Sequence, residues 1–119
     1  MSKTDIQRVS DYLDHIQQAI ARIHRYIGDM KASDFLSDEK TQDAVVRNLE
    51  IIGEAARNIK RYHPGFSASH PDLPWESAYE MRNALSHGYS KVDLDIVWRT
   101  IQADLPGLER RIRDLRAGL

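Results

Sequence analysis

The chain has 119 residues, of which 41% are hydrophobic and 29% are charged, with a formal net charge of −1. These values predict one globular domain over residues 1–119 and argue against a protein that coats nucleic acid through overall basicity. Cysteine is absent, which excludes disulfides and thiolate metal sites, and neither a membrane span nor a signal peptide is recognisable, so we expect a cytoplasmic location without membrane contact.

The first predicted helix extends from about residue 4 to residue 27. Apolar residues recur there every three or four positions, as the inward face of an amphipathic helix requires. Gly28 follows at the position where a helix often ends in a left-handed residue. The apolar stripe consists of Val9, Leu13, Ile16, Ile20, Ile23 and Ile27.

A second stripe predicts a helix with Ser37 as its N-cap and its end at His63-Pro64-Gly65. Gly53 lies inside this helix, where glycine costs about 1 kcal/mol relative to alanine, so close approach by another helix should compensate. Packing within the monomer is the favoured explanation, and a role in a dimer or a cleft stays open. The stripe consists of Val45, Leu49, Ile52, Ala56 and Ile59.

Residues 63–73 are rich in Pro, Ser, His and Gly and are expected to form a loop. A shorter helix should begin near Asp72 and Pro74 and stop at Gly88. Asp93 can cap a last helix, in which Pro106 predicts a kink or a break. That helix carries the stripe Val97, Ile101, Leu105, Leu108, Ile112 and Leu115. The pattern predicts an all-α, up-and-down bundle of four to five helices that dimerises through helix packing.

Charged residues are distributed unevenly. Acidic residues begin the second helix and basic residues end it, and four arginines lie close together near the C-terminus. We interpret both clusters as complements of the helix dipole, with attraction of phosphate as the second interpretation. The residues are Asp38, Glu39 and Asp43; Arg57, Lys60, Arg61 and His63; and Arg110, Arg111, Arg113 and Arg116.

Metal binding is not predicted. Glu50 and Glu54 could bind a metal, but no Glu-x-x-His pattern accompanies them, and ion pairs with Arg47 and Arg57 explain them better. The remaining histidines show no ligand spacing and are expected at the surface or in loops; they are His15, His24, His63 and His70.

The segment Met81-Arg-Asn-Ala-Leu-Ser-His-Gly-Tyr89 gathers chemically active groups at one predicted helix end. Such a set suits metal-free cleavage of RNA, because the imidazole of His87 can transfer protons near neutral pH and the guanidinium of Arg82 can hold two phosphate oxygens. Asn83 can donate a further hydrogen bond. Spacing alone leaves a structural interpretation open, since a histidine at a helix C-terminus is favoured by the dipole and Tyr89 can serve as a packing residue.

A single histidine is a weakness of this interpretation, because acid and base catalysis usually needs two groups. A symmetric dimer would bring two copies of Arg82 and His87 into one cleft. Tyr89 or a second histidine could also supply the missing group.

The Arg-x4-His-x-Tyr pattern of Arg82, His87 and Tyr89 resembles the motif of HEPN-domain ribonucleases, in the HepT-like toxin branch. The resemblance extends over about residues 5–115. It includes Arg47-Asn-Leu-Glu-Ile-Ile-Gly-Glu-Ala-Ala56, Pro74-Trp75, Met81-Arg82 and Val92-Asp-Leu-Asp-Ile-Val-Trp98.

This resemblance implies a dimeric endoribonuclease toxin that needs no cofactor and has Arg82 and His87 as catalytic residues. It also implies a minimal nucleotidyltransferase antitoxin as partner, and Tyr89 as the residue that the partner modifies with adenylyl groups. Two other hypotheses remain: a non-catalytic helical module that binds a nucleotidyltransferase or a nucleotide, and a bundle that binds a ligand or a metal.

Overall fold

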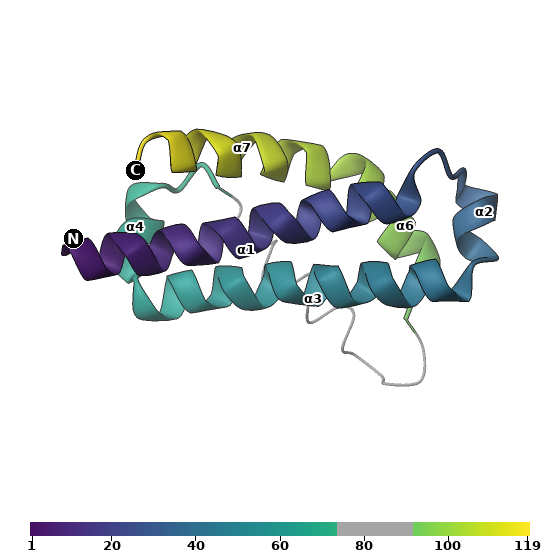
Figure 1. Cartoon of the computed structure of the whole chain (residues 1–119), viewed down its shortest axis with the longest axis horizontal. Helices are drawn as coiled ribbons and strands as arrows, with labels where there is room; N and C mark the ends of the chain where they lie inside the picture. Colours follow the sequence, from purple (N-terminus) through teal and green to yellow (C-terminus); the bar gives the residue numbers. More distant parts are fainter. Residues whose placement is uncertain (74–91) are drawn as a thin grey trace.

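The computed structural model describes residues 1–73 and 92–119, and every regular element within them is an α-helix. The all-α prediction is therefore confirmed. Two long helices, α1 (Lys3–Ile27) and α3 (Glu39–Tyr62), lie side by side, and α7 (Leu105–Ala117) runs along α1 (Figure 1). The shorter helices are α2 (Ala32–Leu36), α4 (Pro64–Ser69) and α6 (Leu94–Ala103).

Helix α1 begins and ends close to the predicted residues. Ser2 is the N-cap, and its hydroxyl accepts a hydrogen bond from the amide of Asp5 at 3.1 Å. Gly28 ends the helix with a φ of +52°, a conformation that glycine adopts without steric cost. All six residues of the predicted stripe are buried, together with Ala19.

Helix α3 starts one residue later than the sequence pattern suggested. Asp38, and not Ser37, is the N-cap, and its carboxylate accepts a hydrogen bond from the amide of Thr41 at 3.0 Å. The hydroxyl of Ser37 instead donates to the carbonyl of Ser33 at 2.9 Å and so belongs to the end of α2. The predicted end is confirmed, since Tyr62 is the last helical residue and His63 is the C-cap.

The expected loop over residues 63–73 is wrong in its first half, which forms helix α4. Pro64 stands in the first turn, where its fixed φ suits a helix, and the carbonyl of His63 accepts hydrogen bonds from the amides of Phe66 and Ser67. Burial of Phe66, which is 5% exposed, holds this turn on the core. Helix α2 was also not predicted, and its only buried residue is Phe35.

The last predicted helix is broken, as Pro106 indicated. Helix α6 ends at Ala103 and α7 begins at Leu105, with the proline in the first turn of α7. Asp93 caps α6 as expected, accepting hydrogen bonds from the amides of Asp95 and Ile96 at 3.1 and 3.2 Å. The buried stripe continues across the break through Val97, Ile101, Leu105, Leu108 and Ile112.

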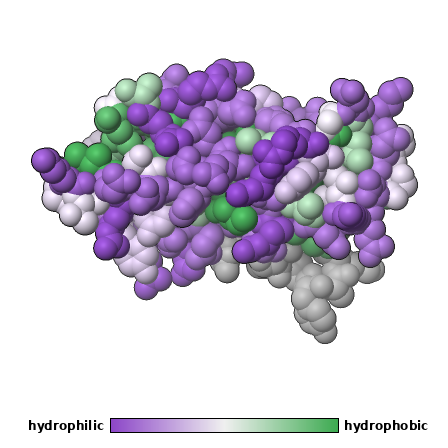
Figure 2. Space-filling view, in the orientation of Figure 1, coloured by the Kyte–Doolittle hydropathy of each residue, from purple (hydrophilic) through white to green (hydrophobic). Residues whose placement is uncertain are grey.

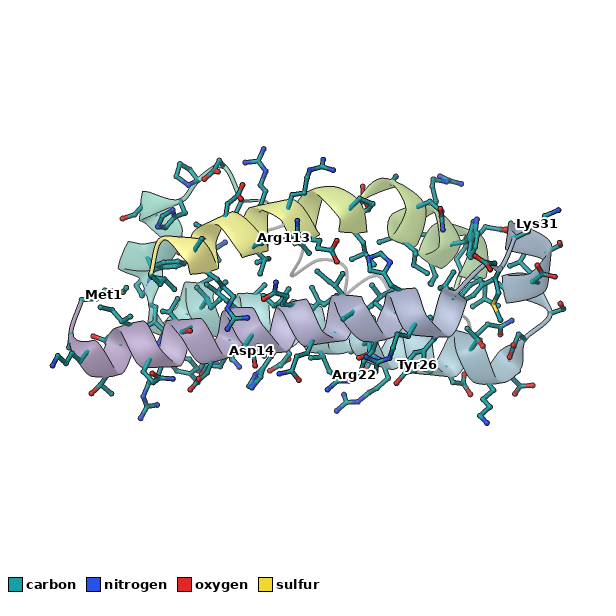
Figure 3. The ribbon with its side chains drawn as sticks, turned by 45° about the horizontal axis from the view of Figure 1, so that its top comes forward. Met1, Asp14, Arg22, Tyr26, Lys31 and Arg113 are labelled. Atoms are coloured by element: carbon teal, nitrogen blue, oxygen red, sulfur yellow. The ribbon has the colours of Figure 1, made fainter. Side chains whose placement is uncertain are left out.

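Polar contacts between helices show that α3 and α7 both run antiparallel to α1. On the α3 side, Arg22 donates to the side chain of Asn48 at 3.4 Å, and His63 at the end of α3 lies 3.8 Å from Asp5 near the start of α1. On the α7 side, Arg116 lies 3.0 Å from Asp14 and His24 lies 3.3 Å from Glu109. Figure 3 shows Asp14 near the middle of α1 with α7 running beside it.

Three of the four clustered arginines form ion pairs. Arg111 pairs with Asp72 at 2.9 Å, Arg113 with Glu109 at 3.5 Å, and Arg116 with Asp14. These contacts give the cluster a structural role, because two of them join α7 to other parts of the chain.

The outer surface is predominantly hydrophilic on the side shown in Figure 2, where hydrophobic residues form small, separated patches. No helix in the described part of the chain combines the length and the apolar character that a membrane span needs.

The cap of α6 provides a test of the fold. Replacing Asp93 by alanine removes the acceptor for two amides, so we expect the free energy of unfolding to fall by about 1 kcal/mol. Asp104 is a matched control, because it occupies the N-cap position of α7 without a side-chain cap bond. Urea unfolding followed by circular dichroism should show little change for Asp104→Ala; equal losses in both variants would contradict the assigned cap.

Candidate functional site

The residues predicted to form the site are Arg82, Asn83, His87 and Tyr89. All four lie in residues 74–91, outside the described residues, as does the helix predicted to end at Gly88. The structure therefore describes the parts of the fold that precede and follow this segment.

Both flanks of the segment are attached to the core. Leu73 is 2% exposed, and the preceding Asp72 is paired with Arg111. On the other side, Val92 and Leu94 pack against the core, and Asp93 between them caps α6. Residue 73 and residue 92 thus have fixed positions relative to the bundle.

The signature Arg47–Ala56 forms the middle of α3, and its two faces have different roles. The inner face is buried and includes Asn48, Leu49, Ile52 and Gly53. Burial of Gly53 agrees with the expected close packing. The outer face carries the predicted ion pairs, which are confirmed: Arg47 lies 3.6 Å from Glu50, and Arg57 lies 3.9 Å from Glu54.

A hollow of about 490 Å³ lies between this outer face and α1. Its charged residues are Arg47, Glu50 and Glu54, so carboxylates outnumber guanidinium groups. An anionic ligand such as phosphate is disfavoured by that balance. The lining is completed by Tyr12, His15, Ile51, Ala55 and Asn58.

His63 is buried, which corrects the expectation that it lies at the surface. It is 8% exposed, its Nδ1 atom lies 3.8 Å from the carboxylate of Asp5, and its ring packs near that of Tyr12. The position at the end of α3 explains this, because the start of α1 covers it. Such a buried side chain is held away from any substrate that approaches from solvent.

The other described histidines also have structural neighbours. His24 is paired with Glu109, His15 lies edge-on to Tyr12, and the ring of His70 lies 4.5 Å from that of Phe66. Across residues 1–73 and 92–119, no three acidic or histidine side chains are grouped closely enough to hold a metal ion.

Among the described residues, two carboxyl groups have a lowered pKa, and both lie at helix N-termini. The hydroxyl of Ser2, with its amide, lowers the pKa of Asp5, and the amide of Thr41, with its hydroxyl, lowers the pKa of Asp38. In each case hydrogen bonds favour the charged form. These shifts reflect helix capping and do not indicate acid–base catalysis.

The fold defines an all-α protein built on antiparallel helices. A family model described as HepT-like, ribonuclease HepT-like, matches residues 16–115. The chain therefore belongs to the HepT-like ribonuclease family, and it is an endoribonuclease in class.

Relatives support the same assignment. The chain is 42% identical to "Probable ribonuclease HepT" of Thermococcus cleftensis, over 89% of this chain and 94% of the relative. It is 35% identical to a "Putative RNase" of Caldanaerobacter subterraneus, over 87% of this chain and 90% of that protein. A Methanocaldococcus jannaschii protein named "Gamma-glutamylcyclotransferase and putative RNase" is 38% identical, and the match covers 46% of its length. No solved structure matches significantly.

The cap of α3 predicts a specific pH dependence. The pKa of Asp38 in the folded protein lies below its ordinary value of 3.8, so its stabilising effect is complete above that pH and is lost as the pH falls through the folded-state pKa. Asp38→Ala should therefore destabilise the protein at pH 7. The difference in stability between this variant and the wild type should shrink below pH 3.8.

Thermal unfolding between pH 2.5 and 7 measures this difference. Asp43→Ala is the matched control, because Asp43 is an exposed acid near the start of α3 that caps nothing. If the difference in melting temperature between wild type and Asp38→Ala stays constant over the whole pH range, the stabilising effect of Asp38 does not depend on its ionisation.

Proposed function

We propose that this chain is a metal-independent endoribonuclease in which Arg82 and His87 act directly on the scissile phosphate. The family match carries the proposal, because it extends over residues 16–115 and so includes the segment with both residues.

The chemistry follows from the residue types. The 2′-oxygen of RNA attacks the adjacent phosphorus while His87 accepts its proton, and the bond from phosphorus to the 5′-oxygen breaks as that oxygen gains a proton. The products are a 2′,3′-cyclic phosphate and a free 5′-hydroxyl. Arg82 stabilises the negative charge that develops on the non-bridging oxygens, and Asn83 donates a further hydrogen bond.

A homodimer supplies the second proton-transfer group. One protomer has a single histidine in the motif, His87. Two copies of His87 facing one cleft would provide both an acid and a base. The twofold axis would also place two Arg82 side chains beside the same RNA strand.

The chain would act as the toxin of a toxin–antitoxin pair, with a minimal nucleotidyltransferase as antitoxin. Its proposed point of control is Tyr89, two residues from His87. Transfer of an adenylyl group to the phenol oxygen, with release of pyrophosphate from ATP, places a bulky phosphodiester beside Arg82. The phosphodiester would pair with the guanidinium of Arg82, which would then no longer be available to RNA, and the bulk of the added group would block the cleft.

Variants of the motif test the catalytic proposal. Arg82→Ala and His87→Ala should each lower the RNA cleavage rate about a hundredfold or more, because each removes a group that acts in the transition state. Cleavage of a labelled RNA by purified, chelator-treated protein measures the rate, and a cyclic phosphate end identifies the chemistry. Circular dichroism and light scattering verify that helicity and dimerisation are retained.

His15→Ala and Arg99→Ala are matched controls, since both residues are exposed and lie outside the motif. They should cleave RNA like the wild type. If unmodified wild-type protein leaves varied RNAs intact, the chain is instead a non-catalytic module that binds its partner.

Modification of Tyr89 is tested separately. Wild-type protein incubated with ATP and a nucleotidyltransferase of the antitoxin type should gain the mass of one or more adenylyl groups and lose cleavage activity. Tyr89→Phe should gain no mass and should stay active in the same mixture. Mass gain in Tyr89→Phe would place the modification on another residue.

A further inference from the structure

A hollow of about 520 Å³ lies at the end of the bundle where α2, the start of α3 and the start of α6 come together (Figure 1). Its lining is partly apolar and partly polar, and it comes from all three helices. The apolar residues are Leu36, Val46, Val92 and Leu94, and the polar residues are Ser37, Glu39, Gln42 and Asp43. None of these residues belongs to the proposed catalytic motif.

The apolar part of this hollow is open to solvent. Leu36 is 43% exposed, although the adjacent Phe35 is fully buried, and Val46, Val92 and Leu94 are only partly buried. A single exposed leucine is ordinary on a protein surface. Apolar side chains from three segments that line one hollow and are rimmed by polar residues are instead typical of a contact with another protein.

The polar rim is acidic. Glu39 and Asp43 line the hollow without a cation, and among the described residues neither carboxylate has an ion-pair partner. Residues 31–43 contain four carboxylates and two lysines, which leaves a net charge of −2. Arg47, one turn beyond Asp43, is paired with Glu50 and lines the other hollow. The rim therefore favours a partner that carries positive charge.

The dipole of α3 explains only part of this acidity. A helix N-terminus carries a charge of about +0.5, and its effect fades within the first turn. Asp38 is the N-cap and Glu39 is the first helical residue, so both lie within that turn. Asp43 lies one turn later and caps nothing. Its carboxylate is therefore available to a cation from outside the chain.

We infer that this hollow docks a segment of the nucleotidyltransferase partner in which apolar side chains are flanked by lysine or arginine. This inference rests on the proposed toxin–antitoxin function. The apolar side chains of the segment fill the hollow beside Leu36 and Leu94, and its cations pair with Glu39 and Asp43. RNA is disfavoured as an occupant because the carboxylates repel phosphate. A second copy is disfavoured because a twofold contact places the same acidic rim against itself.

The position of the hollow suits a partner that acts on Tyr89. Val92 lines the hollow and is three residues beyond Tyr89 in the sequence. An extended chain of three residues spans at most about 11 Å. Docking at the hollow therefore holds the active site of the partner close to the phenol oxygen that it modifies and raises its effective concentration there.

Binding of a purified, fluorophore-labelled minimal nucleotidyltransferase, the same enzyme as in the Tyr89 test, measures the docking. Leu36→Ala removes apolar surface and Asp43→Lys reverses one rim charge, so each should weaken binding about fivefold or more. Asp43→Lys should also make the affinity less dependent on salt, because an attractive charge pair is lost. In the adenylylation assay, both variants should need a higher concentration of this chain for half-maximal rate and should keep the maximal rate.

Ile6→Ala and Asp114→Lys are matched controls. Ile6 is 37% exposed near the start of α1, at the opposite end of the bundle from α2, and Asp114 is an exposed acid of α7 (Figure 1). Both variants should bind the partner like the wild type. Asp43→Asn removes the charge without adding a cation and should weaken binding less than Asp43→Lys. Circular dichroism verifies folding, and every variant should cleave RNA at the wild-type rate.

The outcomes separate this inference from the proposed function. If Leu36→Ala and Asp43→Lys bind the partner as tightly as wild type and Tyr89 is still modified, the docking surface is wrong and the proposed function stands. If binding depends on both residues but wild type cleaves no RNA, the docking surface stands and the catalytic proposal fails.

Two further results would overturn the inference. If wild type cleaves RNA but binds no nucleotidyltransferase, the docking surface and the antitoxin proposal are both wrong, and the catalytic proposal stands. If Leu36→Ala and Asp43→Lys bind the partner normally but lose dimerisation in light scattering, the hollow belongs to a contact with a second copy of the chain.

Discussion

The bundle depends on simultaneous burial of two sides of α1. Its apolar stripe packs against α3 on one side and α7 on the other, so residues such as Leu13 and Ile20 are fully buried. A buried Leu or Ile side chain contributes about 1.5–3 kcal/mol, and the stripe contains several of them. Loss of either neighbour would expose part of that surface, so α3 and α7 must both be in place for α1 to be buried.

Polar contacts between the helices select one register within that packing. Apolar stripes alone allow a helix to slide by a turn, whereas Asn48 is 5% exposed and keeps both of its side-chain atoms satisfied only opposite Arg22, with its amide on the carbonyl of Ala44. The pair of Arg116 with Asp14 has the same effect on α7. A shift of one turn would separate these partners and leave Asn48 with a buried, unsatisfied oxygen.

The two flanks of the motif segment connect the family assignment with the proposed function. Leu73 and Asp93 fix the two flanks of the motif segment to the core, and the family match continues through both. The hollow beside Arg47 carries more acid than base, which disfavours the phosphate backbone of RNA there.

Local sequence determined the helices, because apolar periodicity and capping are properties of neighbouring residues. Spacing of one to four residues predicted the stripe of α1, the cap at Asp93, the break at Pro106 and the ion pairs of α3, and the motif identified the family.

Four local features were predicted wrongly from the sequence: the cap at Asp38, the short helices α2 and α4, and the burial of His63. Each of the latter three depends on a distant partner. Phe35 and Phe66 gain their burial from the assembled core, and His63 is covered by α1, more than fifty residues earlier. Tertiary structure alone decided which polar residues meet, because contacts between helices join residues that no local pattern relates.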